Sequence, residues 1–553
     1  MKLELHWSDG TILTKEYSDA VTPEMILQDI GYDCGHTVVG CRLNREPIRM
    51  NENITEDGVL ELLDIRDAYA NMSYQTSLIF LYIHAVHTVI GRNVQVKVEN
   101  SLSKGLFTTL HGARPEERAA RKIQAYMEEQ VRKCVPIRET WHTREEILRM
   151  ITEEGGRNRL PVYETAPDIT GSYVCEINGE KDIFYIHMVP HCGYLKLFEV
   201  RRYRGGLLLR FPHLKYPDRV PPFEEQKVLY GAFSEETQWQ KLMQVRYAWE
   251  LNRTVENGKA EELIMLSEAL HEKKIANIAE TIRKKKKRII LIAGPSSSGK
   301  TSFARRLCIQ LKVLGLDPLY LGTDDYFVDR DEMVPDEKGE LDFETIEAVD
   351  MELFGRQMNA LLNGETVDIP EFDFIEGKKN YGRRIVSIAD DQPIVIEGIH
   401  ALNPRLTSGI KNDQKYRIYI SPLTQLNIDR HHRVPTTDAR MLRRMVRDHR
   451  TRGRDAAQTI REWPSVRRGE ETWIFPFNSE ADMFFNSHCL YELAVLKKYA
   501  KPLLKEITPD MPEYPEAQRM LEFLAFFAEL EDDSVILNNS ILREFIGGSI
   551  LVK

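Results

Sequence analysis

The stretch RIILIAGPSSSGKTS, residues 288–302, decides the fold of the C-terminal half of this 553-residue chain. Its apolar run Ile289–Ala293 has the length and the β-branched side chains of a buried parallel strand. The pattern G-x-x-x-x-G-K-T follows at residues 294–301 and leads into a helical pattern, SFARRLCIQLKVLG. Strand, loop and helix in this order are the context that a phosphate-binding P-loop requires. The stretch therefore predicts a nucleoside triphosphate site.

Each part of this loop has a physical role toward phosphate. Backbone N–H groups turn inward around phosphate oxygens, and the N-terminus of the following helix adds partial positive charge. Lys300 can reach the outer phosphates, and the Thr301 hydroxyl can bind Mg²⁺. The residues predicted to bind the nucleotide are Gly294, Pro295, Ser296, Ser297, Ser298, Gly299, Lys300, Thr301 and Ser302.

Length and composition set limits on the whole chain. Its 553 residues exceed a single core and suggest about three or four domains. A formal net charge of −10 gives no reason to expect general affinity for nucleic acids or membranes. Seven cysteines without a C-x-x-C pair do not form a disulfide framework, and the longest apolar run, 78–90, is too short to span a membrane. We expect a cytoplasmic protein without a signal peptide.

Residues 1–64 alternate apolar and polar side chains as β-strands do. Strands fit residues 3–7, Val38–Leu43 and 59–64, a helix fits Pro23–Ile30, and the sequence DGT marks a tight turn. This pattern resembles a TGS domain, the ubiquitin-like β-grasp module at the front of threonyl-tRNA synthetases and some translation-associated GTPases. A generic ubiquitin-like adaptor is the alternative.

Residues 65–223 indicate a mixed α/β region. Its segments HTVIG (87–91), VENSLSKGLF (98–107) and HMVPHCGYLKLFEV (187–200) resemble the second, editing domain of threonyl- and alanyl-tRNA synthetases. The resemblance covers the region in outline, and we expect a degenerate editing-like domain that serves binding or regulation.

That family implies a metal site built on an H-x-x-x-H pair. Only His87 fits the pair, because Ile83 stands at the other position. His187 and His191 could complete a zinc site with His87, although Pro190 argues against a helix that would align them. Histidines with core or surface roles are the favoured interpretation.

Residues 224–287 have a helical pattern and are predicted to be a linker. The linker ends in a basic run at residues 284–288. A nucleic-acid contact is one interpretation of that run. Cations in the last turn of a helix, where they complement its dipole, are the favoured one.

Two further predicted strands end in acidic residues. Residues 318–322 lead into Asp324 and Asp325, and residues 393–396 lead into Glu397. Parallel α/β sheets bind their ligands at the carboxyl ends of the strands. One aspartate there could bind Mg²⁺ or take a proton from an acceptor hydroxyl, and Glu397 stands at the Walker-B position. A helix cap or turn is the alternative for the aspartate pair.

Twelve arginines and no lysine fall between residues 430 and 468. Four of them share one face of a predicted helix: Arg440, Arg443, Arg444 and Arg447. The repeated choice of arginine indicates planar, bidentate recognition of phosphate or carboxylate. A lid that closes over phosphates is favoured over a solvated basic face or an RNA-binding patch.

Several motifs occur in the order seen in the uridine kinase/phosphoribulokinase family. They are GPSSSGKTS, TDDYF, IPEFDF (369–374), VIEGIHAL (395–402) and RMLRRMVRDHRTRGRD (440–455). The chain from about residue 288 to 486 resembles this family, and the whole arrangement is similar to bacterial uridine kinase-like nucleoside kinases. The resemblance implies ATP and Mg²⁺ as cofactors and transfer of a phosphoryl group to a nucleoside hydroxyl.

The resemblance also implies residue roles. Asp324 would deprotonate or orient the acceptor hydroxyl, with Asp325 as the fallback. The expected catalytic residues are Asp324, Lys300, Arg440 and Arg443. The expected Mg²⁺ ligands are Thr301, Asp324 and Glu397, and the arginines that close over the transferring group are Arg452 and Arg454. The expected substrate contacts are Asp324, Asp325, Tyr326, Phe372, Asp373, Arg440 and Arg443.

One departure from the family concerns the acceptor. Uridine kinases read the pyrimidine with a tyrosine and a histidine, where this chain has Phe372 and Gly377. A site that loses such hydrogen-bonding groups loses discrimination. A phosphoribulokinase-like sugar-phosphate kinase therefore stays an alternative. A regulatory ATPase that contacts RNA or tRNA through the front domains is another, and a homo-oligomer is left open.

The predicted architecture is a multidomain α/β protein. Its expected parts are a β-grasp domain (1–64), an α+β editing-like region (65–223), a helical linker (224–287), a P-loop kinase domain with a parallel sheet and flanking helices (288–487), and a helical C-terminal extension with a tail (488–553). In the tail, Arg543 and Gly547-Gly548 could form a clasp over the active site. A terminal strand or packing tail is favoured.

Overall fold

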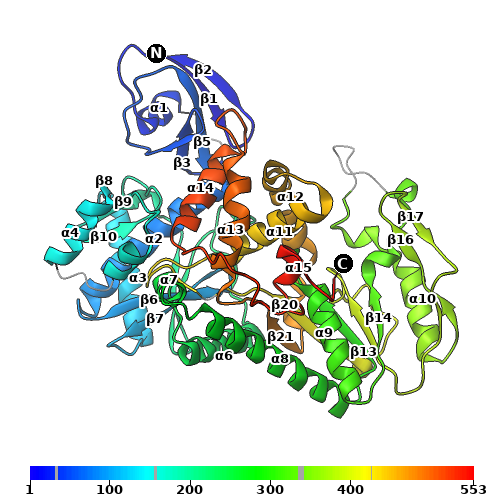
Figure 1. The fold of residues 1–553 in the computed structure, drawn as a ribbon. Coiled ribbons are helices and arrows are strands. Elements are labelled where there is room, and N and C mark those ends of the chain that lie inside the picture. The colour runs from blue at the N-terminus through cyan, green and yellow to red at the C-terminus, as the bar shows by residue number, and fades with distance from the viewer. Residues whose placement is uncertain (32–34, 155–158, 334–341, 425, 553) are drawn as a thin grey trace.

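A computed structural model describes residues 1–31, 35–154, 159–333, 342–424 and 426–552. Figure 1 shows the N-terminal sheet standing apart from the rest, a second region of strands and helices, and a C-terminal half built on a parallel sheet. Within the described residues, no helix combines the length and the apolar character that a membrane crossing needs.

The N-terminal sheet has five strands in the order β2-β1-β5-β3-β4. β1 and β5 pair in parallel, and the other neighbours are antiparallel. The predicted helix is confirmed: Thr22 caps its N-terminus, and Gly31 ends it with a φ of 62°. The elements are β1 (Lys2–Trp7), β2 (Ile12–Glu16), α1 (Pro23–Ile30), β3 (Val38–Leu43), β4 (Glu46–Ile48) and β5 (Gly58–Asp64). Relation to TGS domains stays a prediction.

The second region packs two antiparallel sheets around a long helix, α2. The strand orders are β11-β12-β7-β6 and β10-β9-β8. The apolar run 78–90 lies within α2 and is mostly buried in the core of this region. The elements are α2 (Ala68–Val89), β6 (Gln95–Leu102), β7 (Gly105–His111), α3 (Glu117–Arg132), β8 (Arg138–Thr143), α4 (Arg144–Glu154), α5 (Leu160–Thr165), β9 (Gly171–Ile177), β10 (Glu180–Phe184), β11 (Glu199–Tyr203) and β12 (Gly206–Arg210).

Three helices follow, α6 (Lys227–Met243), α7 (Ala248–Glu256) and α8 (Ala260–Lys284). The basic run begins in the last turn of α8, as predicted, and its cations face the negative end of the helix dipole. α8 is more than a linker, because Ile275, Ile278 and Ile282 are buried in the same core as α9.

The C-terminal half contains a five-stranded parallel sheet in the order β14-β19-β13-β20-β21. Three predicted strands are confirmed as β14 (Leu319–Gly322), β19 (Ile394–Glu397) and β20 (Lys415–Ser421), beside the central β13 (Ile289–Ala293). β21 (Met483–Asn486) was not predicted, because its four residues carry no periodic signal. The other elements are α9 (Lys300–Val313), α10 (Met351–Leu362), β15 (Val367–Asp368), β16 (Glu371–Asp373), β17 (Lys378–Asn380), β18 (Ile385–Val386), α11 (Thr436–Arg452) and α12 (Ala456–Trp473).

The C-terminal extension packs back onto the parallel-sheet half. It contains α13 (Glu492–Lys505), α14 (Tyr514–Ala525) and α15 (Arg543–Ile546). Figure 1 shows α15 beside α9, and Ile541, Leu542 and Phe545 are buried in the core that surrounds the P-loop helix. The tail is a packed segment without a strand in its described residues, so the expected packing tail is confirmed and its alternative, a terminal strand, is wrong. The domain boundaries stay predictions.

Candidate active site

The P-loop connects β13 to α9, and two of its glycines are required by close contacts. A Cβ atom on Gly294 would clash with the carbonyl oxygen of Ile420. One on Gly299 would clash with the side chain of Ile541, and Gly299 also has a φ of 82°, which favours glycine. The loop is therefore fixed on one side by β20 and on the other by the C-terminal tail.

Four predicted residues gather where β13, β14 and β19 end. The Thr301 hydroxyl donates to Oε1 of Glu397 over 3.0 Å, and the Tyr320 hydroxyl donates to the same oxygen over 3.1 Å. Lys300 acts electrostatically on both Asp324 and Glu397, and its Nζ donates to two carbonyl oxygens at the start of the loop over 3.1 and 3.2 Å. The structure thus brings together the lysine and the three predicted Mg²⁺ ligands.

Lys300 exerts the largest charge effect on each of the two carboxyl groups of this cluster. Burial raises the pKa of Asp324; Lys300 opposes this rise, and Asp325 adds to it. Burial also raises the pKa of Glu397, where Lys300 again opposes and Asp324 adds. Carboxylate and hydroxyl oxygens are the hard ligands that Mg²⁺ prefers. The donor set therefore fits the ion that the sequence implies.

The two residues that follow Asp324 have structural roles. Asp325 forms an ion pair with Arg384, with Nη1 2.8 Å from Oδ2. Tyr326 is fully buried, and its hydroxyl donates to Gln357 over 2.9 Å. Asp324 is therefore the aspartate that belongs to the cluster, and Tyr326 belongs to the core instead of the predicted substrate contacts.

The arginines of α11 lie on one helical face, but this face is turned toward the protein itself. Nε of Arg440 donates to the carbonyl oxygen of Ser296 over 3.0 Å, and the same guanidinium pairs with Glu470. Arg443 pairs with Glu492 over 2.5 Å. Both arginines are almost completely buried. They hold the P-loop backbone and balance buried carboxylates, whereas the sequence predicts contacts with acceptor and phosphates.

Arg452 is the last residue of α11, and Arg454 follows the glycine that ends the helix. The helix continues through Arg452 and ends at Gly453, with a φ of 62°. The Arg452 side chain is 51% exposed, and its charge acts on Asp324 to lower the pKa of that carboxyl. Arg454 pairs with Glu462. Of the two predicted lid arginines, Arg452 is therefore the one whose charge acts on Asp324.

The predicted acceptor side is built differently from the family pattern. Phe372 is buried against Phe374, with ring centroids 5.2 Å apart. Asp373 accepts backbone N–H groups of the following turn, so it shapes the loop. Gly377 has a φ of 72°, and the side chain of Arg330 fills the place of its missing Cβ. A histidine at position 377 would be strained and would clash with Arg330, which explains the departure.

Sequence reasoning missed two acids near the loop, the half-buried Glu344 and the fully buried Glu470. Glu470 accepts the N–H of Ser296 over 3.2 Å in addition to its pair with Arg440. Burial raises the pKa of Glu344 to about 7, and Glu470 adds to this rise while Lys300 opposes it. No local motif marks either residue, because their role depends on partners distant in sequence.

The C-terminal tail reaches the first turn of α9. Oε2 of Glu544 accepts the hydroxyl of Ser302 over 2.6 Å and its N–H over 3.3 Å. Arg450 donates to the carbonyl oxygens of Glu544 and Phe545, which holds the tail against α11. Arg543, the predicted clasp residue, instead donates to carbonyl oxygens within the tail. The tail thus returns to the P-loop, through Glu544.

The structure does not bring His87, His187 and His191 into one metal site. Each has its own acidic neighbour. Nδ1 of His87 lies 2.5 Å from Oε1 of Glu180, and Nδ1 of His187 lies 2.5 Å from Oε1 of Glu139. Nε2 of His191 lies 3.6 Å from Oε1 of Glu24. His187 and His191 lie outside any α-helix, as Pro190 suggests. Among the described residues, only Glu268, His271 and Cys489 bring three ligand-type atoms close enough for one ion. These histidines therefore offer no zinc site here.

Comparison with known protein families identifies the parallel-sheet half of the chain. Residues 289–493 match the model of the Phosphoribulokinase / Uridine kinase family. This part of the chain is a kinase domain of that family. The matched range begins at β13 and ends in α13, so it contains the P-loop, the acidic cluster and the arginines of α11.

Two curated relatives each match about a third of the chain. The uridine kinase of Macrococcus caseolyticus (strain JCSC5402) is 28% identical over 196 residues, which is 35% of this chain and 85% of the relative. The uridine kinase of Staphylococcus aureus (strain JH9) is 29% identical over 199 residues, with the same coverage. A solved structure described as a "possible uridine kinase" from Bacillus stearothermophilus is 21% identical and covers 38% of this chain and 97% of its own, with a TM-score of 0.26. A score this low adds no argument.

Proposed function

We propose that this chain is an ATP- and Mg²⁺-dependent kinase that phosphorylates a sugar hydroxyl of a nucleoside. The observation that carries the proposal is the cluster of Lys300, Thr301, Asp324 and Glu397 at the end of a family-matched parallel sheet. Thr301, Asp324 and Glu397 would hold the ion, which would neutralise phosphate charge when bound. Asp324 would orient and deprotonate the acceptor hydroxyl, and Lys300 would bind the outer phosphates.

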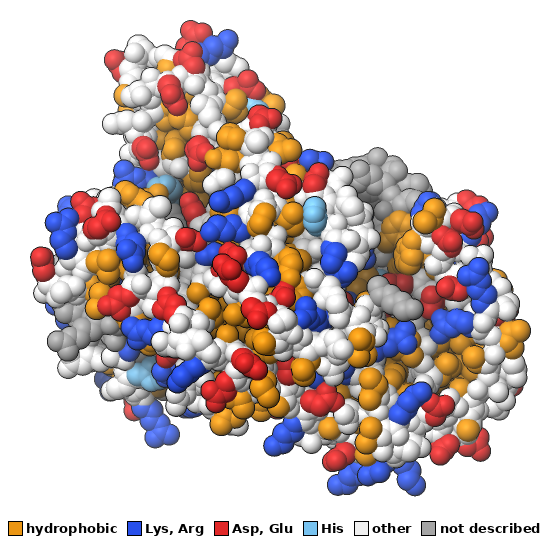
Figure 2. Space-filling view, viewed as in Figure 1, with side chains coloured by type: hydrophobic (Ala, Val, Ile, Leu, Met, Phe, Trp, Pro, Cys, Tyr) orange, Lys and Arg blue, Asp and Glu red, His pale blue; other side chains and the backbone are white. Residues whose placement is uncertain are grey.

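A sugar-phosphate acceptor is the second candidate. Arg330 lies at Gly377, on the side where uridine kinases read the base, and its guanidinium donates to the carbonyl oxygens of Phe374 and Ile375. A cation there suits an acceptor that already carries phosphate. Acidic and basic side chains are interspersed over the face in Figure 2, which favours a small acceptor over RNA at that face.

The test is ATP consumption by the full chain across a panel of nucleosides and sugar phosphates, with a control that lacks any acceptor. Turnover that depends on one nucleoside supports the first candidate, and turnover that depends on a sugar phosphate supports the second. Turnover indifferent to every acceptor contradicts both and favours the RNA-linked regulatory ATPase. Lys300→Ala should abolish turnover in every case, which excludes a contaminating ATPase.

A further inference from the structure

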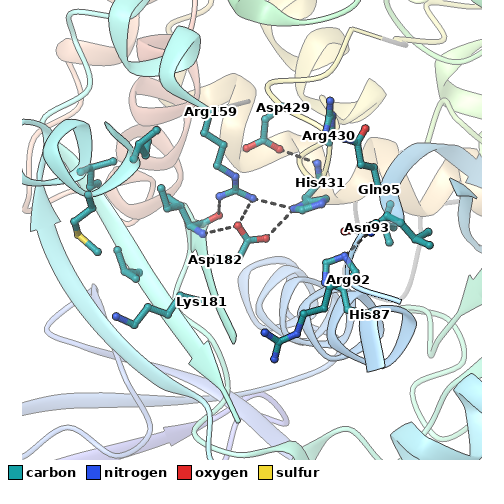
Figure 3. Close-up of a pocket in the computed structure, with 17 residues that line it drawn as sticks. His87, Arg92, Asn93, Gln95, Arg159, Lys181, Asp182, Asp429, Arg430 and His431 are labelled. Carbon is teal, nitrogen blue, oxygen red and sulfur yellow. Dashed lines mark hydrogen bonds and ion pairs between the residues drawn. The ribbon is translucent and has the colours of Figure 1, made fainter. Parts of the chain in front are cut away.

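A cavity of about 560 Å³ lies between the second region and the loop that connects β20 to α11. Its lining comes from the end of α2, from β6, α4, β9 and β10, and from residues 429–431 (Figure 3). None of these lining elements is part of the P-loop or of the acidic cluster. The cavity is in the size range of sites for small molecules.

One wall of this cavity is apolar, and cations outnumber anions among its charged lining residues. The apolar wall consists of Ile147, Met150, Ile151, Val174 and Ile183. The charged lining residues are four Arg or Lys and two Asp: Arg92, Arg159, Lys181 and Arg430, with Asp182 and Asp429. Two positive charges are therefore in excess, before any charge on His87 and His431.

The acids of the cavity already have partners. Asp182 pairs with Arg159 over 2.5 Å and with His431 over 2.8 Å. Oδ2 of Asp429 accepts the hydroxyl of Tyr185 over 3.1 Å, and its Oδ1 accepts the backbone N–H of His431 over 2.8 Å. Figure 3 draws the bonds among Arg159, Asp182, Asp429 and His431, which fix this end of the cavity.

Unlike these two acids, the side chains of the cations Arg92 and Lys181 have no bonded partner among the described residues. Figure 3 shows them on opposite sides of the cavity, Arg92 after the end of α2 and Lys181 on β10. Both are exposed, and within the described part of the chain neither side chain has an ion pair or hydrogen bond. Two cations are thus available to an anion that enters between them.

We propose that this cavity is a second ligand site, for a small molecule that joins a phosphate group to an apolar body. Arg92 and Lys181 bind the phosphate, because guanidinium and ammonium groups form charge-assisted hydrogen bonds with its oxygens. The wall of Ile147, Met150 and Ile183 receives the apolar body. The proposal concerns a site separate from the P-loop and does not depend on which acceptor the kinase uses.

The test uses phenyl phosphate as the probe and the full-length chain, with binding measured by isothermal titration calorimetry. The double variant Arg92→Ala/Lys181→Ala should weaken binding by about tenfold or more, since two charge-assisted contacts are lost. The matched control is Arg118→Ala/Lys122→Ala, which removes the same charge from exposed positions on α3. This control and Lys300→Ala should both bind the probe as the unaltered chain does.

Three results would overturn the proposal. They are an absence of binding to the unaltered chain at millimolar probe, equal affinity in the pocket variant and its control, and loss of binding in Lys300→Ala, which would place the probe on the P-loop. Benzyl alcohol, which has the apolar body without the phosphate, should bind much more weakly than phenyl phosphate. Both pocket residues are exposed, so an unchanged melting temperature verifies that the variants fold.

Discussion

At the scale of single residues, Asp324 and Asp325 are neighbours with different partners. Asp324 belongs to the cluster with Lys300 and Glu397, whereas Asp325 is paired with Arg384. Asp324→Asn should therefore lower turnover by about 10²- to 10⁴-fold, the range for loss of a general base. Its melting temperature should stay close to that of the unaltered chain.

The matched variant Asp325→Asn separates the two roles. It should lower the melting temperature by several degrees, because it leaves Arg384 without its ionic partner, and retain most of the turnover. Steady-state kinetics and thermal unfolding of both variants decide the matter. A dead Asp325→Asn beside an active Asp324→Asn would reverse the assignment.

Glu344 gives a prediction about pH. Its pKa is raised from 4.5 to about 7 by burial. Between these values the folded chain holds a proton that the unfolded chain has lost, so this group makes the free energy of unfolding fall as pH rises. From about pH 5 to about pH 8, the unaltered chain should become less stable relative to Glu344→Gln.

Thermal unfolding of both proteins at each pH measures this difference. Other raised carboxyls, such as Glu236, are common to both proteins and cancel in the comparison. A difference in melting temperature that does not change with pH would mean that Glu344 titrates near its ordinary value.

At the scale of elements, the sequence predicts what is local and misses what depends on distant partners. The strand β13, the P-loop and α9 are contiguous, so hydrophobic run and glycine spacing suffice to predict them. The prediction that the arginines of α11 share one helical face is also correct. Its role could not be predicted, because Glu470 and Glu492, which neutralise Arg440 and Arg443, belong to other elements.

The tail shows the same limit and gives a prediction of its own. Glu544 occupies an N–H group in the first turn of α9, where helix N-termini of P-loop proteins attract phosphate. The Glu544 carboxylate and a bound triphosphate therefore compete for the partial positive charge at the N-terminus of α9. Glu544→Gln should tighten ATP binding by about three- to tenfold, the size of a charge–dipole term.

Direct titration of ATP into each variant measures the effect. Glu531→Gln is the control, since it removes an equal charge from an exposed position of the same segment. If Glu544→Gln lowers the melting temperature and leaves the ATP affinity unchanged, the carboxylate is only a structural cap of α9.

At the scale of the whole molecule, hydrogen bonds connect the second region to the kinase domain through the loop between β20 and α11. The N–H of Val98 on β6 donates to the carbonyl oxygen of Arg430 over 2.9 Å. Nδ2 of Asn427 donates to the carbonyl oxygen of Val98 over 2.7 Å. The same loop leads into α11, whose Arg440 holds Ser296 of the P-loop. The cavity at residues 429–431 and the nucleotide site thus share one continuous element.

A ligand that binds in the cavity contacts residues 429–431 of this loop and should therefore raise the affinity of the P-loop for ATP. We expect phenyl phosphate to tighten ATP binding by about fivefold, at the lower end of coupling between distant sites. Thermodynamic reciprocity requires ATP to tighten phenyl phosphate binding by the same factor. Arg92→Ala/Lys181→Ala should remove the effect of phenyl phosphate and leave the affinity for ATP alone unchanged. Equal ATP affinities with and without saturating probe would mean that the bonds at Val98 hold the two regions together without transmitting ligand binding.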